Sequence, residues 1–208
     1  MALASTVVDS FNDGAAASFW APFGVYSEAG GELRLSSTAG TTNYAGYETS
    51  AGYDLTGNYV LARLLTAGNQ ALTSWQCKPC EVKIDANNTL AFYVNNGNLV
   101  LQKQVATAYA DVRADTAYSA SAHRWFRIRE SGGTTYADYS ADGVDWTNYT
   151  SLANPFAMTN LILEMSAGTY NAEGSATFAI MDSFNILPTG SPRIKAGNGM
   201  SVTGSRAS

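Results

Sequence analysis

The chain has 208 residues, of which 46% are hydrophobic and 14% are charged, and its formal net charge is −5 at pH 7. This length fits a single all-β sandwich, and 19 glycines with 12 tyrosines favour strands and tight turns over helices. The acidic balance argues against a nucleic-acid partner, because phosphate binding needs a clustered basic surface. No apolar run approaches the roughly 20 residues that cross a bilayer, so we expect no membrane insertion.

Short alternating segments separated by turn residues predict strands along residues 6–187, at the spacing typical of a β-sandwich. Residues 123–129 alternate throughout, so Phe126 should face the core while Trp125 and Arg127 face the other side. The main predicted strands span residues 6–11, 32–36, 43–49, 59–65, 80–84, 89–94, 99–104, 123–129, 134–140, 161–165 and 175–187.

The sequence Asp-Ser-Phe-Asn occurs at residues 9–12 and again at 182–185. We expect the two copies to lie side by side in terminal strands, which would close the sheet and remove an exposed edge. Pro188 ends the predicted domain, so residues 1–188 form the sandwich and residues 189–208 form a basic, Gly/Ser-rich tail. The tail residues expected to contact neighbouring copies are Arg193, Ile194, Lys195, Met200 and Val202.

Several segments follow one another in a characteristic order: Asp9-Ser-Phe11, Tyr59-Val-Leu-Ala-Arg63, Val82-Lys-Ile-Asp85, Leu90-Ala-Phe-Tyr-Val94, His123-Arg-Trp-Phe-Arg-Ile-Arg129, Ser140-Ala-Asp-Gly-Val-Asp-Trp146 and Met181-Asp-Ser-Phe184. This ordered set resembles the concanavalin A-like lectin/glucanase superfamily, in its LamG or DUF1349-like branch. It is also similar to domains of phage minor tail and other virion proteins. The resemblance implies a two-sheet antiparallel jelly roll whose face or loops bind glycans.

Residues suited to catalysis are not arranged in a recognisable pattern. Hydrolases that the sequence resembles carry carboxylates two or four residues apart on one strand, whereas Asp142 and Asp145 lie in a predicted turn. The single histidine, His123, begins a strand, and no nucleophile motif accompanies it. We therefore expect no enzymatic activity.

The two cysteines form a Cys77-Lys-Pro-Cys80 motif, which is known from redox pairs and zinc sites. Zinc needs two further ligands and a redox motif should open a helix, so we expect both cysteines to be structural. The oxygen-rich stretch 85–88 lacks a repeated Asp series and is expected to be a plain turn. The sequence thus predicts no metal site and no cofactor.

Aromatic side chains flanked by polar groups are the candidates for glycan binding, because sugars stack on flat rings and are oriented by a few hydrogen bonds. These candidates are Tyr44 and Tyr47 in a Gly-rich stretch, Trp75 in a predicted loop, and Trp125 with Arg127 on one strand face.

Two functions remain open from the sequence. The first is a non-enzymatic structural or adhesion protein of a phage tail or capsid surface, located in the virion. Its partners would be further copies, other virion proteins and a cell-surface glycan. The second is a secreted carbohydrate-binding module. Residues 1–9 show no secretory signal and the basic tail follows an acidic body, so we favour the first.

Overall fold

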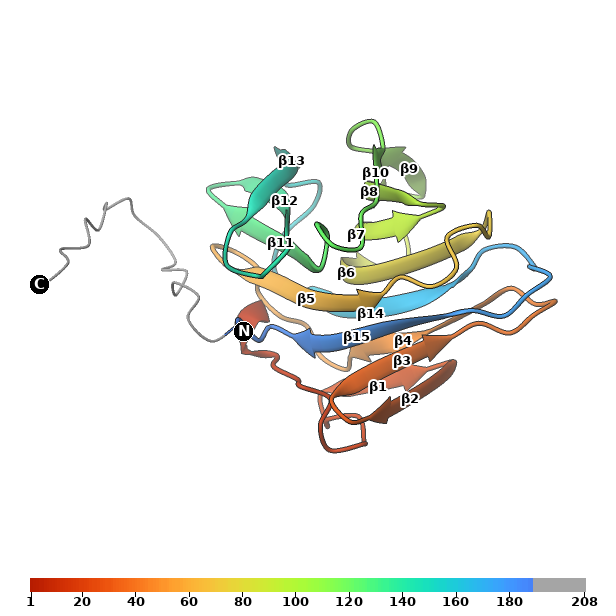
Figure 1. The fold of residues 1–208 in the computed structure, drawn as a ribbon. Helices are drawn as coiled ribbons and strands as arrows, with labels where there is room; N and C mark the ends of the chain where they lie inside the picture. The colour runs from red at the N-terminus through yellow and green to blue at the C-terminus, as the bar shows by residue number, and fades with distance from the viewer. Residues whose placement is uncertain (189–208) are drawn as a thin grey trace, which may run out of the picture.

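The computed structural model describes residues 1–188, so the predicted tail residues Arg193, Ile194, Lys195, Met200 and Val202 lie outside the described residues. Two antiparallel β-sheets pack face to face, and the described chain holds no α-helix (Figure 1). A single 3-10 turn, Ala4–Thr6, precedes the strands. The predicted two-sheet jelly roll is confirmed. Nothing in residues 1–188 forms a helix able to span a membrane.

The first sheet, called sheet A here, contains eight strands in the order β1-β4-β14-β6-β7-β8-β10, with β9 paired to β8. Its strands are β1 (Trp20–Phe23), β4 (Asn43–Thr49), β6 (Trp75–Asp85), β7 (Asn88–Asn95), β8 (Asn98–Val105), β9 (Ala108–Asp111), β10 (Thr116–Ala117) and β14 (Ile162–Thr169).

The second sheet, sheet B, contains seven strands in the order β13-β12-β11-β5-β15-β3-β2. Its strands are β2 (Val25–Ala29), β3 (Glu32–Ser36), β5 (Tyr59–Thr66), β11 (Trp125–Ser131), β12 (Thr134–Ser140), β13 (Thr147–Ala153) and β15 (Phe178–Phe184).

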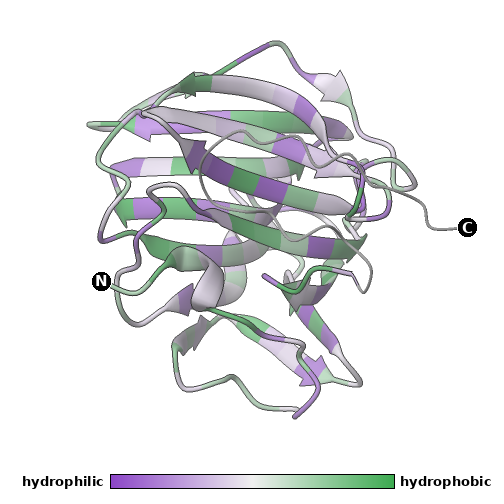
Figure 2. Cartoon of the chain, turned by 90° about the vertical axis from the view of Figure 1, so that its left-hand side faces the viewer, coloured by the Kyte–Doolittle hydropathy of each residue, from purple (hydrophilic) through white to green (hydrophobic). Residues whose placement is uncertain are grey.

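One hydrophobic core fills the space between the sheets because apolar residues alternate with more polar ones along the strands. Hydrophobic and hydrophilic positions alternate visibly along many strands in Figure 2. In β5, for example, Val60, Ala62 and Leu64 are buried in the core while Arg63 faces outward. Full burial of a valine or leucine side chain contributes about 1.5–3 kcal/mol of hydrophobic stabilisation. The alternation therefore fixes which residues are left for the two outer faces.

Strand β6 departs from regular alternation. Its register with β7 shifts between Cys77 and Cys80, and both cysteines are free and fully buried in the core. The bulge thus lets two residues three positions apart face the same way. Burial raises the pKa of both thiols, which keeps them protonated and unreactive.

The two terminal segments lie side by side, as predicted, because Asp9 forms an antiparallel bridge with Phe184. The expected closure of the sheet is wrong, however. Strand β15 lies between β5 and β3 in the interior of sheet B, and the edges of that sheet are β13 and β2. Residues 6–11 form no continuous strand, since Phe11 has a φ of 53°. The N-terminal segment instead crosses over the end of the sheet.

Candidate functional site

A cleft of about 510 Å³ opens on the outer face of sheet A. We call it the tyrosine cleft, and its lining residues are Tyr44, Gln76, Lys78, Tyr93, Asn95, Gln102, Tyr109 and Tyr170. They come from strands β4, β6, β7, β8 and β9 and from the end of β14. Strands distant in the sequence therefore build one site by pairing in the sheet.

The cleft combines aromatic rings with amides. The hydroxyl of Tyr44 donates a hydrogen bond of 2.7 Å to Gln76 Oε1, and the Lys78 ammonium lies 5.6 Å from the centre of the Tyr44 ring. Burial raises the pKa of Tyr44 to about 12, so its hydroxyl stays protonated at neutral pH. Tyr109 is 66% exposed and offers a free ring. Rings with nearby hydrogen-bonding groups are suited to binding sugars.

Beside the cleft, three glutamates lie in one row across neighbouring strands. Glu164 on β14 is paired in register with Glu48 on β4 and with Glu81 on β6. We call these three residues the carboxylate row. Lys83 Nζ lies 2.7 Å from Glu48 Oε2 and 2.5 Å from Glu164 Oε2, and Lys78 Nζ lies 2.9 Å from Glu81 Oε2. Lys83 thus pairs with both Glu48 and Glu164, and Lys78 pairs with Glu81.

The surroundings of the row act on Glu81 and on Lys83 in particular. Burial raises the pKa of Glu81, and the negative charge of Glu164 adds to this effect even though Lys78 opposes it. The two carboxylates around Lys83 raise its pKa, although burial alone would lower it, so its ammonium stays charged beside Glu164. Glu81 is therefore the member that tends to keep a proton, and Glu164 is the member that faces a fixed positive charge.

The spacing of Glu81 and Glu164 is chemically meaningful. Their side chains leave neighbouring strands at paired positions, where Cβ atoms lie about 5 Å apart. Retaining glycosidases hold an acid and a carboxylate about 5 Å apart, a separation that side chains on such paired positions can reach. Their side chains are only 6% and 10% exposed, which strengthens electrostatic interactions at the pair.

Two further polar atoms on this face lack partners. Ser166 Oγ and Asn95 Oδ1 are buried and accept or donate no hydrogen bond within the described chain. Ser166 follows Glu164 on the outer face of β14, and Asn95 lines the cleft. A buried polar group without a partner costs about 1–3 kcal/mol, so both atoms are candidates to hydrogen-bond a ligand or a water molecule at this face.

Of the predicted glycan contacts, the structure places Tyr44 in the cleft but Tyr47 and Trp75 in the core. Both of the latter are fully buried, so neither ring can stack on a ligand. The Tyr47 hydroxyl donates to Glu28 Oε2, and the Trp75 indole donates to the Ala67 carbonyl. Trp75 begins strand β6 and does not lie in a loop, because the strand starts five residues before its predicted start.

Trp125 and Arg127 lie on the outer face of sheet B, remote from the tyrosine cleft. Arg127 is 7% exposed, donates two hydrogen bonds to Asp138 Oδ2, and stacks 4.0 Å from the centre of the Trp146 ring. These bonds occupy the guanidinium and leave it with a structural role. Trp125 is 6% exposed and lines a different pocket.

The titratable residues considered from the sequence are structural. His123 is buried and its Nδ1 accepts a hydrogen bond from the Ser119 amide. Asp142 accepts the amides of Val144 and Asp145 and shapes the turn after β12. Sequence reasoning missed the carboxylate row because its members lie on three strands far apart in the chain. The sequence held one indication of Glu81: residues 80–84 alternate, so Glu81 must point to the face of the strand away from Val82.

No protein-family model matches the chain, and no curated protein is significantly similar to it in sequence. Solved structures do share its fold. A β-1,3-1,4-glucanase (lichenase) from a mouse hindgut metagenome is 10% identical, with a TM-score of 0.64, and the match covers 85% of this chain and 96% of that one. The β-glucanase of Bacillus licheniformis is 10% identical, with a TM-score of 0.62 and coverage of 85% and 95%.

A third neighbour is a xylan β-1,4-xylosidase from Bacillus halodurans C-125, which is 14% identical with a TM-score of 0.59. The match covers 85% of this chain but only 38% of the xylosidase. These likenesses show that the chain shares the jelly-roll fold of these structures, and membership of the concanavalin A-like superfamily stays a prediction. The narrower LamG or DUF1349-like branch stays a prediction.

The comparisons overturn the functional expectation from the sequence. We expected a non-enzymatic virion component, but the structural neighbours described above are glycoside hydrolases. That expectation considered pairs of carboxylates only within single strands. In the structure, the paired carboxyl groups are contributed by β6 and β14.

Proposed function

We propose that this chain binds a polysaccharide in the tyrosine cleft and hydrolyses a glycosidic bond in it with Glu81 and Glu164. The observation that carries the proposal is the register pairing of these two carboxyl groups beside the cleft. The fold shared with glucanases supports it, and β-1,3-1,4-glucan and xylan are the first substrates to test.

Each residue of the pair has a definite role in this reaction. Glu81, with its raised pKa, protonates the oxygen of the leaving sugar. Glu164, held beside Lys83, attacks the anomeric carbon and forms a glycosyl ester as the glycosidic bond breaks. Water then cleaves the ester, giving its proton back to Glu81 and the hydroxyl to the sugar. The configuration of the new reducing end is therefore retained.

The test is the release of reducing sugar from mixed-linkage β-glucan and from xylan by the full chain. Glu81→Gln and Glu164→Gln should each lower kcat/KM by about 10²–10⁴-fold, because each removes one proton-transferring or attacking group. Glu32→Gln is the matched control, since Glu32 is exposed on β3 in sheet B. NMR of the fresh product should show retained configuration.

Three results would contradict the proposal. Wild-type protein that releases no sugar from either polymer would remove the hydrolytic role. Variants as active as wild type would move the chemistry to other residues. Inverted product would contradict the role of Glu164 as nucleophile, because an inverting pair needs about 6.5–9.5 Å between its carboxyl groups.

A further inference from the structure

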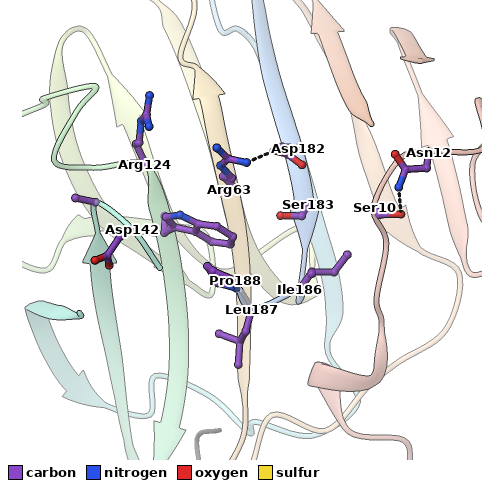
Figure 3. A pocket seen from close by; sticks show the side chains of 12 residues that line it. Ser10, Asn12, Arg63, Arg124, Asp142, Asp182, Ser183, Ile186, Leu187 and Pro188 are labelled. Carbon is purple, nitrogen blue, oxygen red and sulfur yellow. Dashed lines mark hydrogen bonds and ion pairs between the residues drawn. The ribbon is translucent and has the colours of Figure 1, made fainter. Parts of the chain in front are cut away.

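A second pocket, of about 520 Å³, lies on the outer face of sheet B (Figure 3). Three strands contribute Arg63, Trp125 and Asp182 to it, and the turn after β12 contributes Asp142. These strand residues alternate with core residues, so they point away from the sandwich interior. The pocket therefore faces the side opposite to the tyrosine cleft, across the thickness of the domain.

The register of sheet B places a charged pair beside an indole ring. Arg63 on β5 is the cross-strand partner of Trp125 on β11, and its guanidinium lies 5.8 Å from the centre of the indole ring. On its other side Arg63 forms an ion pair with Asp182 of β15, drawn as a dashed line in Figure 3. The two charged side chains remain 35% and 28% exposed, so both can also reach a ligand.

Hydrogen-bonding groups around this pocket are left without protein partners. The indole N–H groups of Trp20, Trp75 and Trp146 each donate a hydrogen bond, whereas that of Trp125 has no acceptor among residues 1–188. The exposed Arg124 side chain, which lines the pocket, forms no ion pair within the same residues. The pocket therefore offers donors that no described protein group occupies.

The remaining wall is apolar and closely packed. Residues 186–188 line the pocket opposite the charged pair. Gly143 has a φ of +77°, and a Cβ there would lie 2.6 Å from Pro188 Cγ and 2.8 Å from Trp125 Cε2. Only glycine allows the turn to approach both rings so closely. The turn and residues 186–188 thereby form a fixed apolar wall against the indole.

We propose that this pocket is a second sugar-binding site, for a neutral sugar unit. A sugar hydroxyl donates and accepts at once, so it can pair with the Asp182 carboxylate and with the Arg63 guanidinium beside it. Two arginines and two aspartates line the pocket, and their formal charges cancel, which favours a neutral ligand over an anion or a cation. Ring faces with sparse polar groups are the usual setting for such ligands.

The position of the pocket gives this site a distinct role. Packed sheets lie about 10 Å apart, so a sugar ring bound on sheet B cannot touch the tyrosine cleft on sheet A. The domain then holds two separate carbohydrate segments, and the second site does not depend on hydrolysis at the carboxylate row. Binding at both faces lets one domain bridge two polysaccharide chains.

The four tryptophan indole N–H signals of the full chain provide a direct readout by 1H–15N NMR. The chain is titrated with cellotetraose and with xylotetraose. At least one of them should shift the Trp125 indole signal saturably, while the indole signals of Trp20 and Trp75, which do not line the pocket, stay in place. A Trp125 signal unmoved by both sugars would overturn the proposal.

Ala141 is exposed at the pocket, so Ala141→Trp should fill it and weaken the Trp125 response at least tenfold. Arg124→Gln should weaken it by a smaller factor, whereas the matched control Lys103→Gln, on β8, should have no effect. A response that survives Ala141→Trp would refute binding in this pocket.

The remaining controls separate the two sites and the ligand class. Glu81→Gln should leave the Trp125 response intact, so failure of hydrolysis and failure of this site are distinguishable. Loss of the Trp125 response in that variant would contradict an independent second site. Tighter binding of glucuronate than of glucose at Trp125 would contradict a neutral ligand.

Discussion

At the scale of single residues, tyrosines only three positions apart have opposite environments. Tyr44 and Tyr47 both lie on β4, but their separation is odd, so they point to opposite faces of sheet A. Tyr44 lines the cleft, whereas Tyr47 is fully buried and packs against Trp20 and Tyr26. The same residue type therefore lines the proposed binding cleft at one position and stabilises the core at the other.

This difference predicts opposite effects of truncation. Tyr109→Ala should weaken binding of β-glucan in affinity electrophoresis and leave the free energy of unfolding unchanged, because Tyr109 is 66% exposed in the cleft. Tyr47→Ala should lower the free energy of unfolding by about 3–5 kcal/mol, since it empties a large volume of the core. Urea denaturation measures the second effect. Equal destabilisation by both variants would contradict the assigned faces.

A second residue-scale prediction concerns pH. Burial, followed by the neighbouring Asp13, raises the pKa of Glu28 from 4.5 to about 7, while Tyr47 donates a hydrogen bond to it. A carboxyl group with a raised pKa in the folded state stabilises the fold fully below pH 4.5, and this stabilisation is lost as the pH rises through about 7.

The free energy of unfolding should therefore fall between pH 5 and pH 8, as measured by urea denaturation at each pH. Glu28→Gln should flatten this part of the profile, because the amide does not ionise. Glu32→Gln, an exposed change on the neighbouring strand β3, should leave the slope as in wild type. A wild-type profile that rises over this range would contradict the expected titration.

At the scale of elements, tight turns decide how closely the two sheets approach each other. Gly24 joins β1 of sheet A to β2 of sheet B with a φ of +70°, and a Cβ there would lie 2.2 Å from the Tyr44 carbonyl oxygen. Gly30 joins β2 to β3 with a φ of +63°, but a Cβ there would meet nothing within 4 Å. The two glycines share a conformation and differ only in their surroundings.

Gly30→Ala should therefore cost about 1–2 kcal/mol, the price of a left-handed alanine. Gly24→Ala should cost more, because the added methyl group also collides with fixed backbone. The midpoint of urea unfolding for each variant measures the two costs. If Gly30→Ala destabilises as much as Gly24→Ala, close packing at the β1–β2 turn is not the deciding factor.

At the scale of the whole molecule, all fifteen described strands lie before Pro188. The hydrophobic core, too, is built from residues 4–184. A chain ending at residue 188 should therefore keep the melting temperature of the full chain to within a few degrees, because cooperative stability comes from the core. Calorimetry of both chains measures this, and failure of the shorter chain to fold would show that residues 189–208 belong to the domain.

Much of the fold could be predicted from the sequence because alternation and turn residues act locally. Strands β4 and β12 have their predicted bounds, and the meander from β11 to β13 follows the order of the predicted segments. Strand β6 was predicted too short. Its bulge interrupts the alternation at Cys77–Cys80, and such an irregularity depends on the neighbouring strand β7.

The candidate site was predictable only in part. Tyr44 was identified because a ring in a Gly-rich strand is a local feature, but local features could not separate it from Tyr47 and Trp75 in the core. Glu48, Glu81 and Glu164 carry no common motif, and they become a site only when β4, β14 and β6 pair in register.

The sequence by itself determined the fold class, most strands and the faces along each strand, because these depend on the period of apolar residues and on turn chemistry. The tertiary structure alone decided the strand order, which brings together residues more than a hundred positions apart, such as Glu48 and Glu164. It also decided which aromatic rings are buried and which glutamates lie on neighbouring strands. Strand pairing over long distances is a property of the whole chain, and both sites depend on it.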